Sequence, residues 1–278
     1  MSITLISDST MDLSPENVEK YNIKIVPLKV IFGEEVYKDY FEMQGRKFYE
    51  KLMPSKEIPK TSQPSPNDFV EEYKKYKYDT IISIHISSKF SGTYQSACIA
   101  RNILAEQDIT VIDSKSTSLG LGLMLIKIAK MIKEGRKKEE IITTIYRIIE
   151  QIKVFFTVDD LIYLERGGRI GKAQAFLGSL LEIKPILFLK DGEIIPYEKV
   201  RTKKKLVQRM FEILKYYVGD GKGYMLAIGD ANVPEIKEEI YNEVKRNYNF
   251  DEIILSEIGA VIGTHTGPGT WGIAFLKT

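Results

Sequence analysis

Thr80-Ile-Ile-Ser-Ile-His-Ile86 is followed at once by Ser87-Ser-Lys-Phe-Ser-Gly-Thr-Tyr94. The first segment is apolar and rich in β-branched residues, which is typical of a short buried strand. The second segment is polar and leads into a helical pattern from Gly92 to Glu106. Ligands of open α/β sheets bind at the carboxyl ends of the strands. This strand, turn and helix therefore indicate an α/β fold and a first candidate site.

The same alternation continues on both sides of this segment. Further strand-like runs lie at Ile3 to Ser7, Ile23 to Phe32 with a break at Pro27, and Thr110 to Ile112. Helical patterns follow at Thr117 to Glu134, which Gly135 would end, and at Lys138 to Ile152. Strands that alternate with helices predict a mostly parallel sheet with helices on both faces.

The second half has a different pattern. Asp191-Gly192 separates two short apolar runs and predicts a β-hairpin. Helical and strand-like segments then alternate: Thr202 to Tyr217, Tyr224 to Ile228, Pro234 to Tyr248, Glu252 to Leu255 and Trp271 to Leu276. A hairpin combined with crossover helices predicts a mixed sheet. We therefore expect two α/β domains, residues 1–154 and 155–278, with the boundary near Val154.

Composition and charge exclude several classes of function. Forty basic residues against thirty-eight acidic ones leave a net charge of +2, which gives little reason to expect nucleic acid as partner. The basic run Lys203-Lys204-Lys205 is too short to indicate binding in a groove of DNA. One cysteine and two histidines cannot build a Cys/His zinc cage, and no carboxylate has metal-like spacing with a histidine, so no metal is expected. Without a signal peptide or a bilayer-spanning run, a cytoplasmic protein is expected.

Two hydroxyl-rich segments are candidates for anion binding. Ser91 follows a predicted strand and is expected to cap the next helix, whose first amides favour a carboxylate or phosphate. Lys60-Thr-Ser-Gln-Pro-Ser-Pro66 places Thr61 and Ser62 between prolines that stiffen the loop. Each segment also has a purely structural interpretation, a helix cap in the first case and a turn in the second, where Ser65 caps a helix beginning near Asn67.

Two glycine-rich segments lie in the second half. Glu165-Arg-Gly-Gly-Arg-Ile-Gly171 puts two arginines around a glycine pair before a predicted apolar helix, although an isolated arginine pair is more often a solvated one. Gly259 to Gly272 is expected to be an irregular loop in which His265 lies in a cleft. Its Gly-x-Gly-x-x-Gly spacing is no dinucleotide fingerprint, because only six residues follow and no helix can be formed from them. Walker A and Gly-x-Ser-x-Gly motifs are both absent.

Taken together, these segments resemble the DegV family of fatty-acid-binding proteins along essentially the whole chain. Five motifs carry the resemblance, in this order: Ile6-Ser-Asp-Ser-Thr10, Thr61-Ser-Gln-Pro-Ser-Pro66, Ser91-Gly-Thr-Tyr-Gln-Ser-Ala97, Tyr163-Leu-Glu-Arg-Gly-Gly-Arg-Ile170 and His265-Thr-Gly-Pro-Gly269. Several separate motifs in one order are far more specific than any one of them.

The resemblance implies a non-catalytic carrier that buries a long-chain fatty acid, such as palmitate, stearate or oleate, between two α/β domains. By position, Thr61 and Ser91 would hold the carboxylate with His265 near it, and Ser62 is a weaker candidate. Arg169 would lie at the mouth. The resemblance further implies that a separate ATP-dependent kinase can phosphorylate the bound acid to an acyl phosphate for phospholipid synthesis. No other cofactor is implied.

One alternative stays open at this stage. His265 as a general base and Ser91 as an anion donor would suit an enzyme that acts alone on a small carboxylate or phosphorylated substrate. The shape of the pocket discriminates the two, because a long apolar tunnel favours the carrier and a small polar pocket favours the enzyme.

Overall fold

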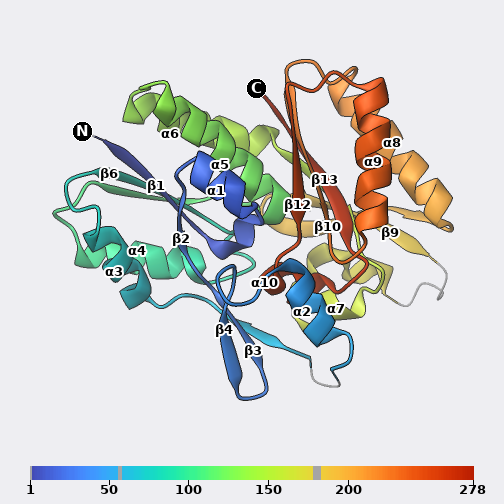
Figure 1. The fold of residues 1–278 in the computed structure, drawn as a ribbon, viewed down its shortest axis with the longest axis horizontal. Helices are drawn as coiled ribbons and strands as arrows, with labels where there is room; N and C mark the ends of the chain where they lie inside the picture. The colour runs from blue at the N-terminus through green and yellow to red at the C-terminus, as the bar shows by residue number, and fades with distance from the viewer. Residues whose placement is uncertain (1, 56–57, 178–182) are drawn as a thin grey trace.

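The computed structural model describes residues 2–55, 58–177 and 183–278. Helices and sheets alternate in layers across the molecule, and a small third sheet projects from one end (Figure 1). The predicted α/β class, with one parallel and one mixed sheet, is confirmed.

A four-stranded parallel sheet occupies the N-terminal half. Its strands, in spatial order, are β2 (Lys24–Val26), β1 (Ile3–Asp8), β6 (Thr80–His85) and β7 (Ile109–Asp113). The helices of this half are η1 (Ser9–Met11), α1 (Pro15–Lys20), α2 (Gly45–Leu52), α3 (Pro66–Lys74), α4 (Thr93–Ile103), α5 (Ser118–Lys133) and α6 (Lys138–Gln151). Helices α3 and α4 cover one face of the sheet, where Phe69 and Ala97 pack on Ile6 and Ile81.

A six-stranded mixed sheet occupies the C-terminal half. Its order is β10 (Glu193–Val200), β9 (Lys184–Lys190), β8 (Lys153–Thr157), β13 (Trp271–Lys277), β11 (Tyr224–Asp230) and β12 (Glu252–Glu257). Its helices are α7 (Ile162–Arg166), η2 (Gly171–Phe176), α8 (Lys203–Val218), α9 (Pro234–Asn247) and α10 (Ala260–Thr266). Helices α8 and α9 cover the outer face, where Ile213 and Ile240 pack with Phe155 and Ile228.

Helix α5 lies between the two larger sheets and joins them through one core (Figure 1). That core contains Leu5 of β1 and Ile84 of β6 together with Met225 of β11 and Ala274 of β13. Because α5 meets apolar partners on both sides, it is apolar nearly all round, with leucine, isoleucine and methionine on every face. The two halves of the chain therefore share a hydrophobic core.

The glycines of α5 let it approach its neighbours closely. A methyl group at Gly122 would lie 2.8 Å from the carbonyl oxygen of Met11, and one at Gly120 would lie 2.6 Å from a methyl of Val154. We expect Gly122→Ala to lower the free energy of unfolding by about 1–3 kcal/mol, because the added methyl meets backbone and not a flexible side chain. A glycine-to-alanine change in a helix otherwise stabilises by roughly 0.5–1 kcal/mol, so urea denaturation that shows stabilisation would contradict the close contact.

A three-stranded antiparallel sheet was not foreseen from the sequence. It consists of β4 (Glu35–Lys38), β3 (Lys29–Phe32) and β5 (Lys60–Ser62). The apolar run from Ile23 to Phe32 is divided at Pro27, as predicted, but its two parts join different sheets. Val30 and Phe32 pack on Phe48 of α2 and Val261 of α10, so this sheet belongs to the wall around α10.

Three local segments test predictions made from the sequence. The predicted hairpin is confirmed: Asp191 and Gly192 both have positive φ at its turn. The segment from Gly259 to Gly272 was wrongly predicted as an irregular loop, because its first part forms α10. The apolar helix predicted after Gly171 begins instead as the 3₁₀ helix η2, and its later part includes residues 178–182, which lie outside the described residues.

Candidate functional site

A pocket of about 300 Å³ lies where the three sheets meet. This volume is at the lower end of the range of about 300–1,000 Å³ typical of small-molecule sites. Most of its wall is aliphatic or aromatic, with contributions from both halves: Leu28, Ile86, Leu119, Val154, Phe156 and Ile194. All five predicted site residues also line it, namely Thr61, Ser62, Ser91, Arg169 and His265.

Thr61 and His265 form a polar contact across the pocket. The hydroxyl oxygen of Thr61 lies 2.8 Å from Nε2 of His265, which joins the small sheet to α10. Nδ1 of His265 is buried without a hydrogen-bond partner and faces Gly167, where a methyl group would lie only 2.3 Å from it. An unpaired buried N–H is rarer than an unpaired acceptor, so we assign the proton to Nε2. The Thr61 hydroxyl hydrogen is then free to donate to a ligand.

The environment keeps the His265 ring neutral. Burial lowers its pKa, and the positive charge of Arg169 lowers it further, to about 4. Both effects disfavour the imidazolium, since one removes hydration and the other adds like charge. At neutral pH His265 is therefore a hydrogen-bonding group and not a cation, and Arg169 supplies the positive charge.

Arg169 connects two segments at the pocket. Its Nε donates to the carbonyl of Phe90 at 3.0 Å, and its Nη1 donates to the carbonyl of Gly167 at 2.6 Å. Gly168, between Gly167 and Arg169 in the chain, has φ +68°, a conformation that favours glycine. The Gly-Gly-Arg segment thus brings a half-buried guanidinium to the pocket and ties it to the turn before Ser91.

Ser91 lies at the pocket but does not cap the helix that follows. That prediction was wrong, because α4 begins at Thr93 with Gly92 at its N-cap. The amides of Phe90 and Ser91 both donate to the carbonyl of Ser87, so the turn ends one residue later than expected. The Ser91 hydroxyl still accepts from the amide of Thr93, the first residue of α4, at 3.3 Å, and it lies 2.9 Å from the Thr93 hydroxyl.

Ser62 points differently from Thr61. Successive side chains of a strand alternate between its faces, so Ser62 and Thr61 lie on opposite faces of β5. The Ser62 hydroxyl donates to the carbonyl of Gln63 at 3.3 Å. Gln63 in turn covers Gly92 and donates to Ser96 of α4 at 3.1 Å, which fixes the loop against that helix. Ser65 caps α3, as predicted.

Two buried carboxyl groups bind the N-terminal end of α10, and neither was identified from the sequence. Asp12 accepts a hydrogen bond from the amide of Gly259 at 2.9 Å, and Asp39 bonds the amides of Ala260 and Val261. Burial raises the pKa of Asp12 well above its usual value and that of Asp39 to about 7. Nothing in the sequence indicated that Asp12 and Asp39 bind these amides, because the amides lie more than 200 residues away along the chain.

Two further observations concern metals and membranes. Within residues 2–55, 58–177 and 183–278, no three His, Cys, Asp or Glu side chains gather closely enough to hold a metal ion. None of the helices found in these ranges has both the length and the apolar character needed to cross a bilayer.

Comparison with known proteins places the chain in a family. The family model described as uncharacterised proteins of the DegV family matches residues 2–278. Protein DegV of Bacillus subtilis strain 168 is 39% identical over 278 residues, which cover 99% of each chain. The chain belongs to the DegV family. Among solved structures, a fatty-acid-binding DegV family protein from Thermus thermophilus superposes with a TM-score of 0.94 at 34% identity, and the match covers 100% of both chains. A stearic-acid-binding protein from Eubacterium ventriosum superposes with a TM-score of 0.91 at 30% identity, covering 100% of this chain and 98% of the other.

Four of the five motifs that resemble the DegV family converge on the pocket of this DegV protein. Thr61, Ser91, Arg169 and His265 each come from one of them. The N-terminal motif, Ile6 to Thr10, lines no part of this pocket although all its residues are buried. This motif lies instead at the end of β1.

Proposed function

We propose that this protein binds a long-chain fatty acid in the pocket, with the carboxylate bound by the hydroxyls of Thr61 and Ser91, His265 beside it holding the Thr61 hydroxyl, and Ser62 as a weaker contact. The observation that carries the proposal is a mainly apolar wall combined with the Thr61–His265 pair. The fatty-acid binding of its structural neighbours supports it. The stand-alone enzyme is less well supported, because most of the exposed wall of the pocket is apolar.

Tail and head group have different roles in this proposal. Burying a sixteen-carbon chain contributes about 0.8 kcal/mol per methylene, or on the order of 12 kcal/mol before ordering costs. A buried carboxylate loses several kcal/mol of hydration unless it is paired or hydrogen-bonded. Each hydrogen bond to a charged group returns roughly 1.5–3 kcal/mol. The tail therefore supplies affinity, and the head-group contacts decide which ligands are accepted.

The domain arrangement proposed from the sequence fits this function. Residues 1–154 and 155–278 would form two domains with the ligand between them. β8 (Lys153–Thr157) is the first strand along the chain to join the six-stranded sheet, and Val154 within it lines the pocket. Because α5 packs on both larger sheets, these domains would be held together as one body.

Organic extraction and mass spectrometry of the purified protein test the function directly. We expect a long-chain fatty acid, such as palmitate, stearate or oleate, at close to one molecule per chain. Repeated extraction that yields no such acid, together with no binding of added acid, would contradict the proposal.

The proposed function includes a partner, an ATP-dependent kinase that phosphorylates the bound acid. Arg169 would contact the transferred phosphoryl group or the kinase. We expect Arg169→Gln to retain the lipid yet reduce acyl phosphate formation by tenfold or more, since one charge-assisted contact is lost. Arg166→Gln is the matched control, because Arg166 is exposed and does not line the pocket. Equal turnover with both variants would contradict the role of Arg169.

A further inference from the structure

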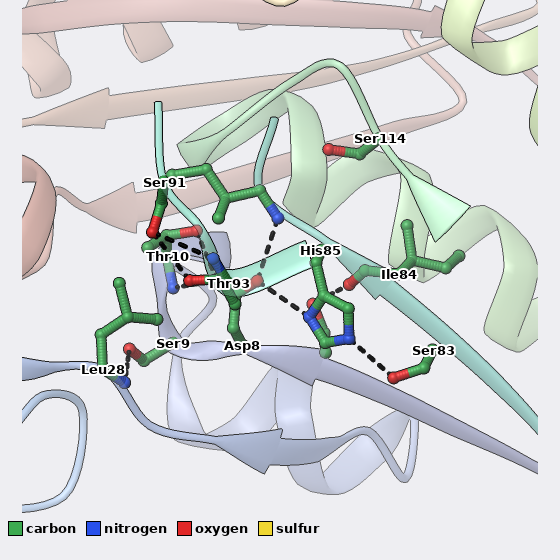
Figure 2. Close-up of polar contacts among 12 residues, drawn as sticks. Asp8, Ser9, Thr10, Leu28, Ser83, Ile84, His85, Ser91, Thr93 and Ser114 are labelled. Atoms are coloured by element: carbon green, nitrogen blue, oxygen red, sulfur yellow. Dashed lines mark hydrogen bonds and ion pairs between the residues drawn. The ribbon is translucent and has the colours of Figure 1, made fainter. Parts of the chain in front are cut away.

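The N-terminal motif ends in a buried carboxylate with an unusually complete set of partners. Asp8 is the last residue of β1 and is fully buried. Its Oδ1 accepts from the amide of Thr10 at 3.1 Å and from the Thr10 hydroxyl at 2.6 Å. Its Oδ2 accepts from Nδ1 of His85 at 3.0 Å and from the amide of Ile86 at 2.9 Å (Figure 2). Four donors on one carboxylate offset the cost of burying it.

His85 is the second member of this network. Since its Nδ1 faces a carboxylate, that nitrogen carries a proton. Its Nε2 lies 2.7 Å from the hydroxyl of Ser83, which itself accepts from the Tyr73 hydroxyl at 2.9 Å. In the neutral tautomer with the proton on Nδ1, Ser83 donates its hydrogen to Nε2, and the bonds run in one direction from Tyr73 to Asp8. All four side chains are fully buried.

The order serine, histidine, aspartate also occurs in hydrolases, but Ser83 is not a nucleophile. Its hydroxyl is enclosed between Tyr73 and His85, and both its donor and its acceptor capacity are used. Phe69 packs edge-on against the His85 ring, with centroids 4.9 Å apart, and closes the remaining side. The network has no room for a substrate.

Two connections lead from this network to the pocket. Ile86, whose amide bonds Asp8, lines the pocket and begins the turn that carries Phe90 and Ser91. Ser9, the next residue after Asp8, accepts from the amide of Leu28 at 3.1 Å, and Leu28 also lines the pocket (Figure 2).

We propose that Asp8 and His85 are positioning residues for the head-group end of the pocket. By holding the Ile86 amide, Asp8 fixes where the turn from Ser87 to Ser91 begins, and His85 fixes the orientation of the Asp8 carboxylate. The Ser91 hydroxyl and the Phe90 carbonyl that binds Arg169 are thereby placed for the carboxylate of the ligand. This inference rests on the proposed function and assigns a role to the one motif that lies outside the pocket.

Two variants of His85 separate positioning from general stability. His85→Asn retains an amide nitrogen near Nδ1 and the bond to Asp8, whereas His85→Gln retains one near Nε2 and loses that bond. Both variants remove the ring and a similar contact with Phe69. The dissociation constants of palmitic acid and of hexadecanol are measured for each protein below its melting temperature, and their ratio reports the head-group end alone.

We expect His85→Gln to reduce the preference for the acid over the alcohol by about tenfold, and His85→Asn to keep it within about twofold of the wild type. We expect Asp8→Asn to reduce the preference for the acid over the alcohol as much as His85→Gln does. Tyr73→Phe removes only the far end of the network, so we expect it to keep the wild-type preference. If His85→Gln and His85→Asn lower the melting temperature alike and leave the ratio unchanged, the network is only structural and the proposal is overturned. A wild-type protein that binds neither ligand would instead contradict the proposed function itself.

Discussion

Thr61→Val is expected to weaken binding of palmitic acid by about 10- to 100-fold, which corresponds to one lost hydrogen bond to a charged group. The change removes the hydroxyl whose hydrogen is free for the ligand, while it keeps the size of the side chain and the β-branched character that suits β5. Hexadecanol forms only a neutral hydrogen bond at the same place. Its affinity should therefore fall by only a few-fold.

Thr266→Val is the matched control for this prediction. Thr266 also lines the pocket, but its hydroxyl already donates to the carbonyl of Ile262 at 3.1 Å within α10. We expect both ligands to bind this variant within about twofold of the wild type, because no contact with the ligand is lost. Isothermal titration of the delipidated wild type and the two variants measures all six affinities. An equal loss of acid and alcohol in Thr61→Val would show that Thr61 does not bind the carboxylate.

The regular elements of this fold were predictable because their signals are local. The apolar run from Thr80 and the turn that follows it predicted β6 and the position of Ser91, and Asp191-Gly192 predicted the hairpin through its need for positive φ. Thr61, Ser62, Ser91, Arg169 and His265 were all named from motifs, and all line one pocket. Their roles toward the carboxylate stay predictions.

Features that depend on distant partners were not predictable in the same way. Helix α10 contains glycine and threonine residues that disfavour an isolated helix, and it is anchored at its first amides by Asp12 and Asp39. Neither carboxylate is close to it in sequence. The small sheet likewise joins β5 to β3 across about 30 residues, and β3 alone looks like the continuation of β2. Such elements form because tertiary contacts outweigh local propensity.

The anchoring of α10 predicts that the stability of the protein depends on pH through Asp39. Burial raises the pKa of Asp39 to about 7, although the Ser9 hydroxyl and three backbone amides bond it and lower the pKa in part. In the unfolded chain the pKa is about 3.9. Between these values the folded protein binds the proton more tightly, so this group lowers stability as the pH rises from about 4 to about 7. The difference between the folded and unfolded pKa values of Asp39 corresponds to a change in the free energy of unfolding on the order of 4 kcal/mol.

His265 opposes this trend over most of the same range. Its pKa is lowered to about 4 in the folded protein, from about 6.5 in the unfolded chain, so its contribution to stability is lost as the pH falls from about 6.5 to about 4. In the wild type the two slopes partly cancel. Relative to the wild type, we expect a rise in pH from 4 to 6.5 to be more stabilising in Asp39→Asn and more destabilising in His265→Gln, as measured by urea denaturation at several pH values. Asp12 is shifted in the same direction as Asp39 and is present in both variants, so it lowers both slopes and leaves the difference between them unchanged. Parallel pH profiles of the two variants would show that the pKa values of Asp39 and His265 are not shifted in opposite directions, and would contradict a neutral His265.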